Sequence, residues 1–142
     1  MKNFYTGLMT YFNAAPGSVH NSFWTAIGGR MFNTVAPEDT TLPYCVFTHV
    51  AGVQSDTFTE DMDEVTLQFS IFSEGSSSGE VHDAMTACKA LFDGCSFQVT
   101  SGVVVQFMRG VDGLIIEDYE TESGSQRIWH YHVDYRVIVR KA

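Results

Sequence analysis

The chain has 142 residues, with 17 acidic and 8 basic side chains and a formal net charge of −9 at pH 7. Hydrophobic residues make up 44% of it, which excludes general disorder, and this length suffices for one domain with a hydrophobic core. Because phosphate contacts require Lys and Arg, the acidic balance argues against tight nucleic-acid binding, although an acidic surface would let DNA pass without sticking.

The first third of the chain predicts two helices and two strands. Apolar residues from Phe4 to Phe12 follow helical spacing, and polar residues interrupt them, so we interpret this run as a helix with one apolar side and not as a signal peptide. A second helix is predicted over 20–27 and a short strand over 30–35. Residues 44–51 favour a strand whose poor alternation predicts cover on both faces. No run of about 18 apolar residues occurs, so we expect no membrane span.

The middle of the chain carries the clearest pattern. Residues 65–71 alternate between apolar and polar, which is typical of a strand with one buried face. Between 81 and 92 the apolar residues recur at helical spacing, and Ser77 with Glu80 predicts a capping box at the start of that helix. We expect the helix to pack on the apolar face of the strand, because neither apolar surface is stable in water.

The last third predicts strands and turns. Short strands are expected over 97–99, 103–109 and 114–118, with a turn at 110–113 signalled by Asp-Gly. Residues 127–140 then alternate cleanly. As one straight strand this run would span roughly 45 Å, more than the diameter of about 37 Å expected for a compact domain of this size. The hairpin must therefore bend or project, and a projecting hairpin could reach a neighbouring subunit.

Together these elements predict an α+β fold, with a mostly antiparallel sheet and two or three helices packed on one face. We expect a single domain over residues 1–142. The polar and acidic stretch 52–62 is interpreted as a loop. The three cysteines, Cys45, Cys88 and Cys95, form no C-x-x-C pair, and we expect free buried thiols of a protein made in a reducing cytosol.

One strand face offers candidate metal ligands. His130, His132 and Asp134 share that face, and two imidazoles with a carboxylate are ligand types of a facial-triad site. Three ligands on one strand rarely converge on an ion without help, for which His49 is the candidate, so we favour solvent-facing polar residues. No nucleophile elbow, P-loop or dinucleotide fingerprint occurs. We assign no catalytic residue, expect no cofactor or metal, and do not expect an enzyme.

Several soft motifs follow one another along nearly the whole chain. They are Ile27-Gly28-Gly29-Arg30 with Phe32, then Ala36-Pro37 and Leu42-Pro43-Tyr44-Cys45-Val46-Phe47, the Val65–Phe72 strand, the Glu80–Asp93 helix and Tyr135-Arg136-Val137. Their succession resembles the tail completion, or tail terminator, proteins of long-tailed bacteriophages (siphoviruses) and prophages.

This resemblance implies a structural function. Such proteins form a ring, commonly a hexamer, on the head-proximal end of the tail tube, where the ring ends tube growth and joins the tail to the filled head. DNA passes through its centre without specific binding. The implied partners are further copies of the chain, the tail-tube protein and a head-completion or connector protein. The implied location is the neck of a virion assembled in the host bacterial cytoplasm.

Two regions are candidates for subunit or lumen contacts, the loop 52–62 and the hairpin 113–128. The residues concerned are Asp56, Glu60, Asp61, Glu117, Tyr119 and Glu122. Two other functions remain open at this point. One is a small metal- or ligand-binding enzyme that uses the His130, His132 and Asp134 face. The other is a plain protein-binding module with one fixed partner.

Overall fold

The computed structural model describes residues 2–13, 21–54, 62–75, 78–99, 102–121 and 124–141, and these form three helices and six strands. The helices are α1 (Lys2–Asn13), α2 (Ser22–Ala26) and α3 (Gly79–Phe92). The strands are β1 (Met31–Asn33), β2 (Tyr44–Gln54), β3 (Met62–Glu74), β4 (Phe97–Val99), β5 (Gly102–Thr121) and β6 (Gly124–Lys141). None of the helices in these ranges is long and apolar enough to cross a membrane.

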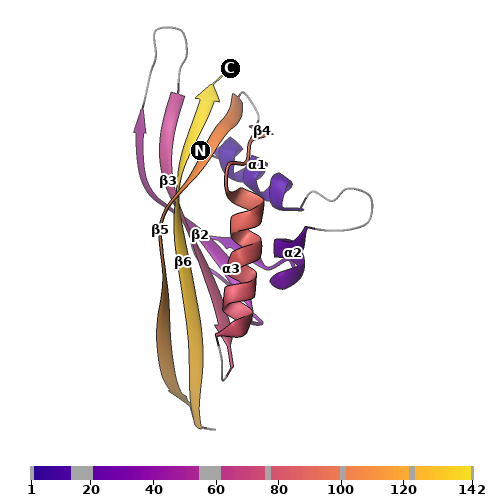
Figure 1. The fold of residues 1–142 in the computed structure, drawn as a ribbon, viewed down its shortest axis with the longest axis vertical. Helices are drawn as coiled ribbons and strands as arrows, with labels where there is room; N and C mark the ends of the chain where they lie inside the picture. Colours follow the sequence, from indigo (N-terminus) through magenta and orange to yellow (C-terminus); the bar gives the residue numbers. More distant parts are fainter. Residues whose placement is uncertain are drawn as a thin grey trace.

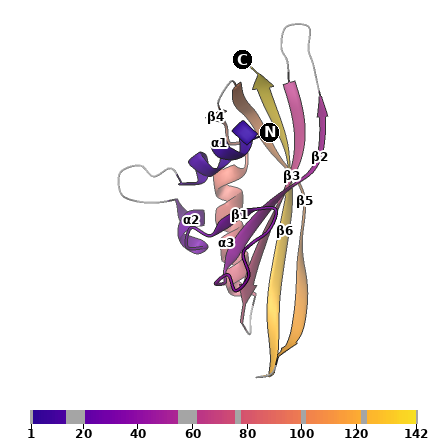
Figure 2. The same cartoon turned by 180° about the vertical axis from the view of Figure 1, so that it is seen from behind.

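All six strands belong to one mixed sheet, in the order β1-β2-β3-β6-β5-β4. β1 runs parallel to β2, and every other neighbouring pair is antiparallel. The three helices lie on one side of this sheet (Figures 1 and 2). The predicted α+β class, with a mostly antiparallel sheet and its helices on one face, is confirmed.

The core lies between the sheet and the helices. The alternation predicted for 65–71 puts Val65, Leu67, Phe69 and Ile71 on the helix-covered face, where each is at most 2% exposed. Phe92 of α3 packs on this face, its ring centroid 4.6 Å from that of Phe69. Burying each such side chain contributes about 1.5–3 kcal/mol before the loss of entropy is subtracted, so this layer holds the fold together.

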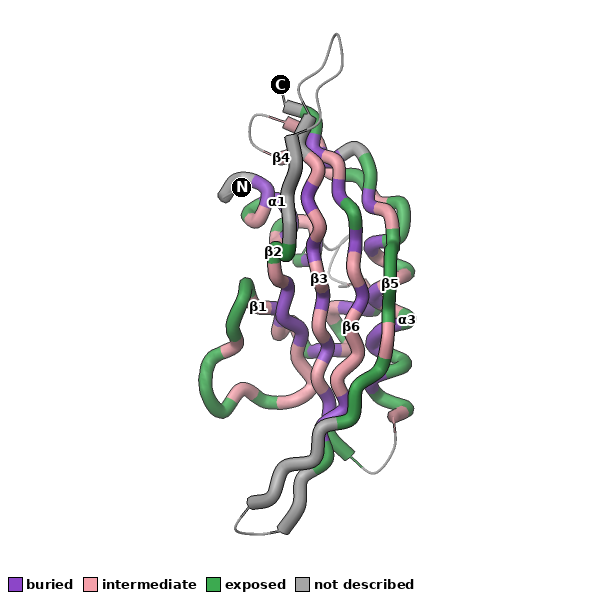
Figure 3. The backbone as a smooth tube through the Cα atoms, turned by 90° about the vertical axis from the view of Figure 1, so that its left-hand side faces the viewer, coloured by how far each residue is buried: buried purple, intermediate pink, exposed green. Residues whose placement is uncertain are grey.

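The opposite face of the sheet carries none of the described helices and is called the open face here (Figure 3). Residues 34–42 run beside its β2 edge, and there Val46 is only 8% exposed although it points to the open face. The start of β2 is thus buried on both faces, as its poor alternation predicted.

The predicted turn at 110–113 is wrong. β5 continues through these residues, and the ladder between β5 and β6 shifts register between Arg109 and Asp112, which is a β-bulge. The physical reason is the length of β6, which pairs with β5 along both stretches and so holds them as one strand. The Asp-Gly signal therefore marks an irregularity within a strand.

One boundary prediction is also corrected. Residues 52–54 and 62 belong to strands β2 and β3, so the loop between them is shorter than 52–62. Ser77 of the predicted capping box lies outside the described residues; α3 begins at Gly79 with Ser78 as its N-cap, and the Ser78 side chain makes no cap hydrogen bond. Gly94 does follow α3 with φ +68°, the left-handed conformation expected after a helix end.

The β5–β6 hairpin extends beyond the rest of the sheet. The last residue of β3, Glu74, pairs with Ile128 of β6, and past this row β5 and β6 pair only with each other. This two-stranded segment, residues 118–121 and 124–127, is called the arm here, and it projects at the lower end of the molecule in Figure 1. The projecting part of β6 is thus residues 124–127, whereas 128–140 pair with β3 along their whole length.

Candidate assembly surface

Most of the residues selected from the sequence cannot be placed. Tyr119 belongs to the arm, where it pairs with Gln126, and Glu117 pairs with Ile128 in the row next to the arm. The other four lie outside the described residues: Asp56, Glu60, Asp61 and Glu122. Their predicted role in subunit or lumen contacts stays a prediction.

The histidine face of β6 lies on the open face of the sheet. His130 stacks on Phe72 with ring centroids 4.4 Å apart, and the centroids of His130 and His132 are 6.0 Å apart. The Asp134 carboxylate accepts a hydrogen bond of 2.9 Å from the side-chain amide of Gln68. These side chains are thus engaged in packing and hydrogen bonding between β3 and β6.

The structure does not bring His49 to this group. His49 pairs with Leu67, whereas His132 pairs with Ser70, three residues further along β3. Within the described ranges no group of three or more His, Cys, Asp or Glu side chains is arranged to hold a metal ion. The open face therefore offers polar surface but no ready set of ligands.

An apolar patch follows the outer edge of β5. Its members are Val111, Leu114, Ile115 and Ile116, which are 70%, 37%, 44% and 53% exposed. β4 covers that edge only from Gly102 to Val104, and the Phe107 carbonyl accepts a hydrogen bond from Gly94, so among the described residues no strand adjoins β5 beyond it. A long edge strand with exposed apolar side chains is a site for pairing with another chain. We call these four residues the β5 edge patch.

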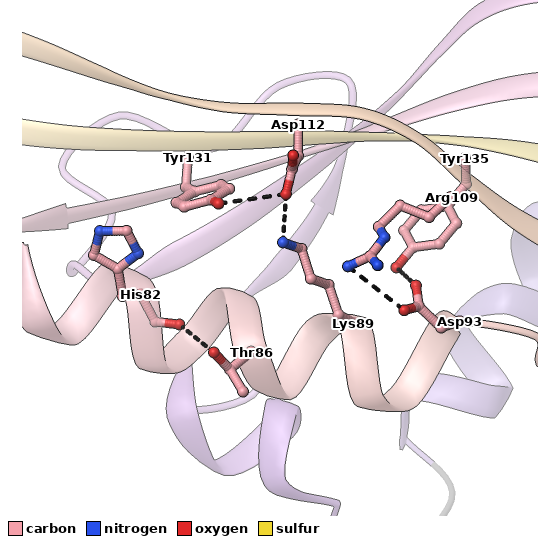
Figure 4. Close-up of polar contacts among 8 residues, drawn as sticks. All are labelled: His82, Thr86, Lys89, Asp93, Arg109, Asp112, Tyr131 and Tyr135. Atoms are coloured by element: carbon pink, nitrogen blue, oxygen red, sulfur yellow. Dashed lines mark hydrogen bonds and ion pairs between the residues drawn. The ribbon is translucent and has the colours of Figure 1, made fainter.

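A polar anchor holds the bulge of β5 against α3 (Figure 4). Lys89 of α3 forms an ion pair with Asp112, and the Tyr131 hydroxyl donates a further hydrogen bond of 3.3 Å to the same carboxylate. The hydrogen bond from Lys89 lowers the pKa of Asp112, and the pKa of Lys89 is raised by the same bond. The β5 edge patch therefore begins at a point tied to the body of the molecule.

A second anchor lies one turn further along α3. The buried Tyr135 hydroxyl donates a hydrogen bond of 2.5 Å to Asp93, whose other carboxylate oxygen is 3.7 Å from the Arg109 guanidinium. Burial, and then the bond to Asp93, raises the pKa of Tyr135, so this phenol stays protonated. Both anchors fix the orientation of β5 and β6 relative to α3.

A largely apolar groove of about 780 Å³ lies at the other edge of the sheet, between α1 and β1. We call it the α1–β1 groove, and its lining residues are Tyr5, Thr6, Met9, Thr10, Asn13, Met31, Phe32, Asn33 and Phe47. Tyr5 is held in place by Phe47, with ring centroids 5.8 Å apart. The groove thus has a preformed apolar floor.

A further concavity, of about 870 Å³, lies on the open face between residues 34–42 and strands β2 and β3. Its lining is more polar and includes the carboxylates Glu38, Asp39 and Glu74. It lies beside the histidine face, and of the stacked pair Phe72 and His130 only Phe72 belongs to its lining.

Sequence reasoning missed both the β5 edge patch and the α1–β1 groove. The patch had a signal, the consecutive apolar residues Leu114, Ile115 and Ile116, which a strand with one buried face does not need. The groove had none, because α1 and β1 meet only through the tertiary fold.

Comparison with known proteins gives one family and one fold. Residues 21–140 match the family model described as tail completion protein gp17. Among solved structures, a chain of the virion of native gene transfer agent (GTA) particle matches with 12% identity and a TM-score of 0.69. This alignment covers 99% of the present chain and 96% of that chain. No curated protein matches.

Proposed function

Because this chain belongs to the tail completion protein gp17 family and is thus a structural protein of a phage tail, we propose that it forms a ring at the head-proximal end of the tail tube. The ring, of six subunits, ends tube growth and presents the surface to which the head binds. Its partners are further copies of itself, the tail-tube protein and a head-completion or connector protein. The assembly takes place in the host bacterial cytoplasm, and the ring remains in the neck of the virion.

The observation that carries this proposal is the family match over 21–140, which includes α3 and all of the sheet except Lys141. The fold is compatible with a ring. A closed ring requires two different surfaces on each copy, because its interface is heterologous. The described chain offers an exposed sheet edge on β5 and a groove beside β1, at opposite edges of the sheet.

The charge of the chain supports passage of DNA through the ring. With 17 acidic and 8 basic residues, the chain has few groups that neutralise phosphates. A ring of net negative subunits repels DNA and therefore does not retain it during ejection. No step of this function requires catalysis.

Negative-stain electron microscopy tests the proposal. Concentrated protein, alone and mixed with tubes assembled from the cognate tail-tube protein, is expected to form rings with an axial hole and to cap one tube end. Capped tubes stop lengthening when more tube protein is added. Tubes that continue to grow from both ends, with no ring on either, would contradict the proposal. In parallel, fluorescence anisotropy with duplex DNA at physiological salt is expected to show no binding.

A further inference from the structure

The β5 edge patch and the α1–β1 groove lie at the same level of the sheet, on its two opposite edges. The ladders connect them in one row: Met31 pairs with Cys45, Cys45 with Ile71, Ile71 with Tyr131, and Tyr131 with Leu114. A second copy placed beside the first in the plane of the sheet therefore brings Leu114 of one copy level with Met31 of the other.

Two members of the β5 edge patch, Leu114 and Ile116, face the same side as the groove, whereas Ile115 pairs with His130 and points to the open face. Residues that pair directly across strands point to the same face, so Leu114, like its partner Tyr131, points to the helix-covered side. Ile116, two residues on, pairs with Trp129 and points the same way. The α1–β1 groove opens on that side, because α1 forms one of its walls and Met31 part of its floor.

Strand direction is compatible with such a junction. β1 is parallel to β2, and β5 is antiparallel to it through β3 and β6, so β5 of one copy meets β1 of the next in antiparallel orientation. Backbone pairing between β5 of one copy and β1 of the next contributes little to this junction. The Met31 N–H already donates to the Gly29 carbonyl, and the Asn33 carbonyl accepts from the Val35 N–H. Apolar side chains must therefore supply the contact.

We propose that the β5 edge patch of one copy of this chain seats in the α1–β1 groove of the next copy. The occupant of the groove is a second copy, because the patch and the groove match in chemistry, level, side and strand direction within one chain. The contact is head to tail, so every copy provides a patch to one neighbour and a groove to the other. This inference rests on the proposed ring and names the surfaces that close it.

Two variants test the contact, each with a matched control. Ile116→Asp places a charge on the patch, and Val35→Asp places one on another exposed apolar side chain, 73% exposed in the 34–42 loop. Thr10→Glu places a charge at the groove. Its control is Thr86→Glu on α3, because both threonines are exposed and each hydroxyl donates a 2.9 Å bond to the carbonyl four residues earlier.

Sedimentation velocity and negative-stain microscopy provide the readout, with thermal melting to verify folding. Ile116→Asp and Thr10→Glu are each expected to melt like the wild type but to form no rings, while both controls form them. An equimolar mixture of Ile116→Asp and Thr10→Glu is expected to stop at dimers, because only one intact patch and one intact groove can combine.

The outcomes separate this inference from the proposed ring. Rings formed by Ile116→Asp or Thr10→Glu overturn the contact and leave the ring standing. A wild type that forms open chains, which both variants abolish, overturns the ring and supports the contact. A wild type that stays monomeric at millimolar concentration, or variants that still dimerise alone, overturn the contact.

Discussion

The two halves of β5 both pair with β6 but differ in their other surroundings. In the first half Val104 and Phe107 are at most 1% exposed, whereas in the second half Leu114 and Ile116 are 37% and 53% exposed. Aromatic rings cover the first half, with Phe107 lying 5.5 Å from Phe92 between ring centroids, and the residues that the structure describes supply no comparable cover for the second.

This difference teaches that an apolar pattern specifies a surface to be covered, but not which chain covers it. The bulge between Arg109 and Asp112 separates the two halves, and the ion pair of Lys89 with Asp112 holds that boundary. The first half is accounted for by folding alone. The second half is accounted for by the contact between copies proposed above.

Phe107→Ala is expected to have the largest effect, because it removes a buried ring from the first half of β5. Truncating a buried Phe typically costs about 3–5 kcal/mol of unfolding free energy. Ile116→Ala, the matched truncation in the second half, is expected to change it by less than about 0.5 kcal/mol. Urea unfolding of both variants measures the contrast, and similar losses for the two would show that the halves do not differ.

Alkaline pH is expected to destabilise the core between α3 and the sheet, where Cys88 and Cys45 are buried. Burial raises the pKa of Cys88 and Cys45 above the ordinary 9.0, so the folded chain keeps protons that the unfolded chain releases. The free energy of unfolding is therefore unaffected by these thiols below pH 9. Above pH 9 it falls by up to about 1.4 kcal/mol per pH unit for each thiol. Denaturant midpoints between pH 8 and 10 provide the measurement.

Cys88→Ala serves as the control for that experiment. The variant is less stable at pH 7 because of the cavity it creates, but its stability should fall less steeply with pH above 9. Equal slopes for variant and wild type would mean that the buried thiol does not govern the alkaline loss. Raising the pH should also lower the hydrogen-exchange protection of the amides from Leu114 to Ile116 less than that of the Phe107 amide.

Lys89→Met is expected to have the smallest effect, because it acts only at the boundary. It keeps the apolar stem beside Tyr131 but removes the partly exposed ion pair with Asp112, at a cost of about 0.5–1 kcal/mol. Since the pKa of Asp112 is lowered, this difference is present at pH 7 and shrinks as the pH falls below 3.8. Urea midpoints at pH 7 and pH 3 check it, and a gap as large at pH 3 as at pH 7 would contradict the assignment.

Sequence reasoning succeeded where one local period decides the structure. The alternation of 65–71 and the helical spacing of 81–92 predicted β3, α3 and their packing, because each apolar surface has to be buried against another. The excess length of 127–140 predicted that the hairpin bends or projects, and the arm does project, although only Arg127 of this run lies in it. The turn predicted at 110–113 was wrong, because pairing with the long strand β6 on both sides keeps these residues within β5 despite the Asp-Gly signal.

The sequence by itself determined the fold class, the covered face of the sheet and the order of motifs that indicates the family. Only the tertiary structure decided that Met31 and Leu114 occupy one row at opposite edges, that α1 and β1 enclose a groove, and that the histidine face packs between strands. The reason is that periodicity acts through neighbours a few residues apart, whereas an edge, a groove and a row are relations between segments far apart in the chain.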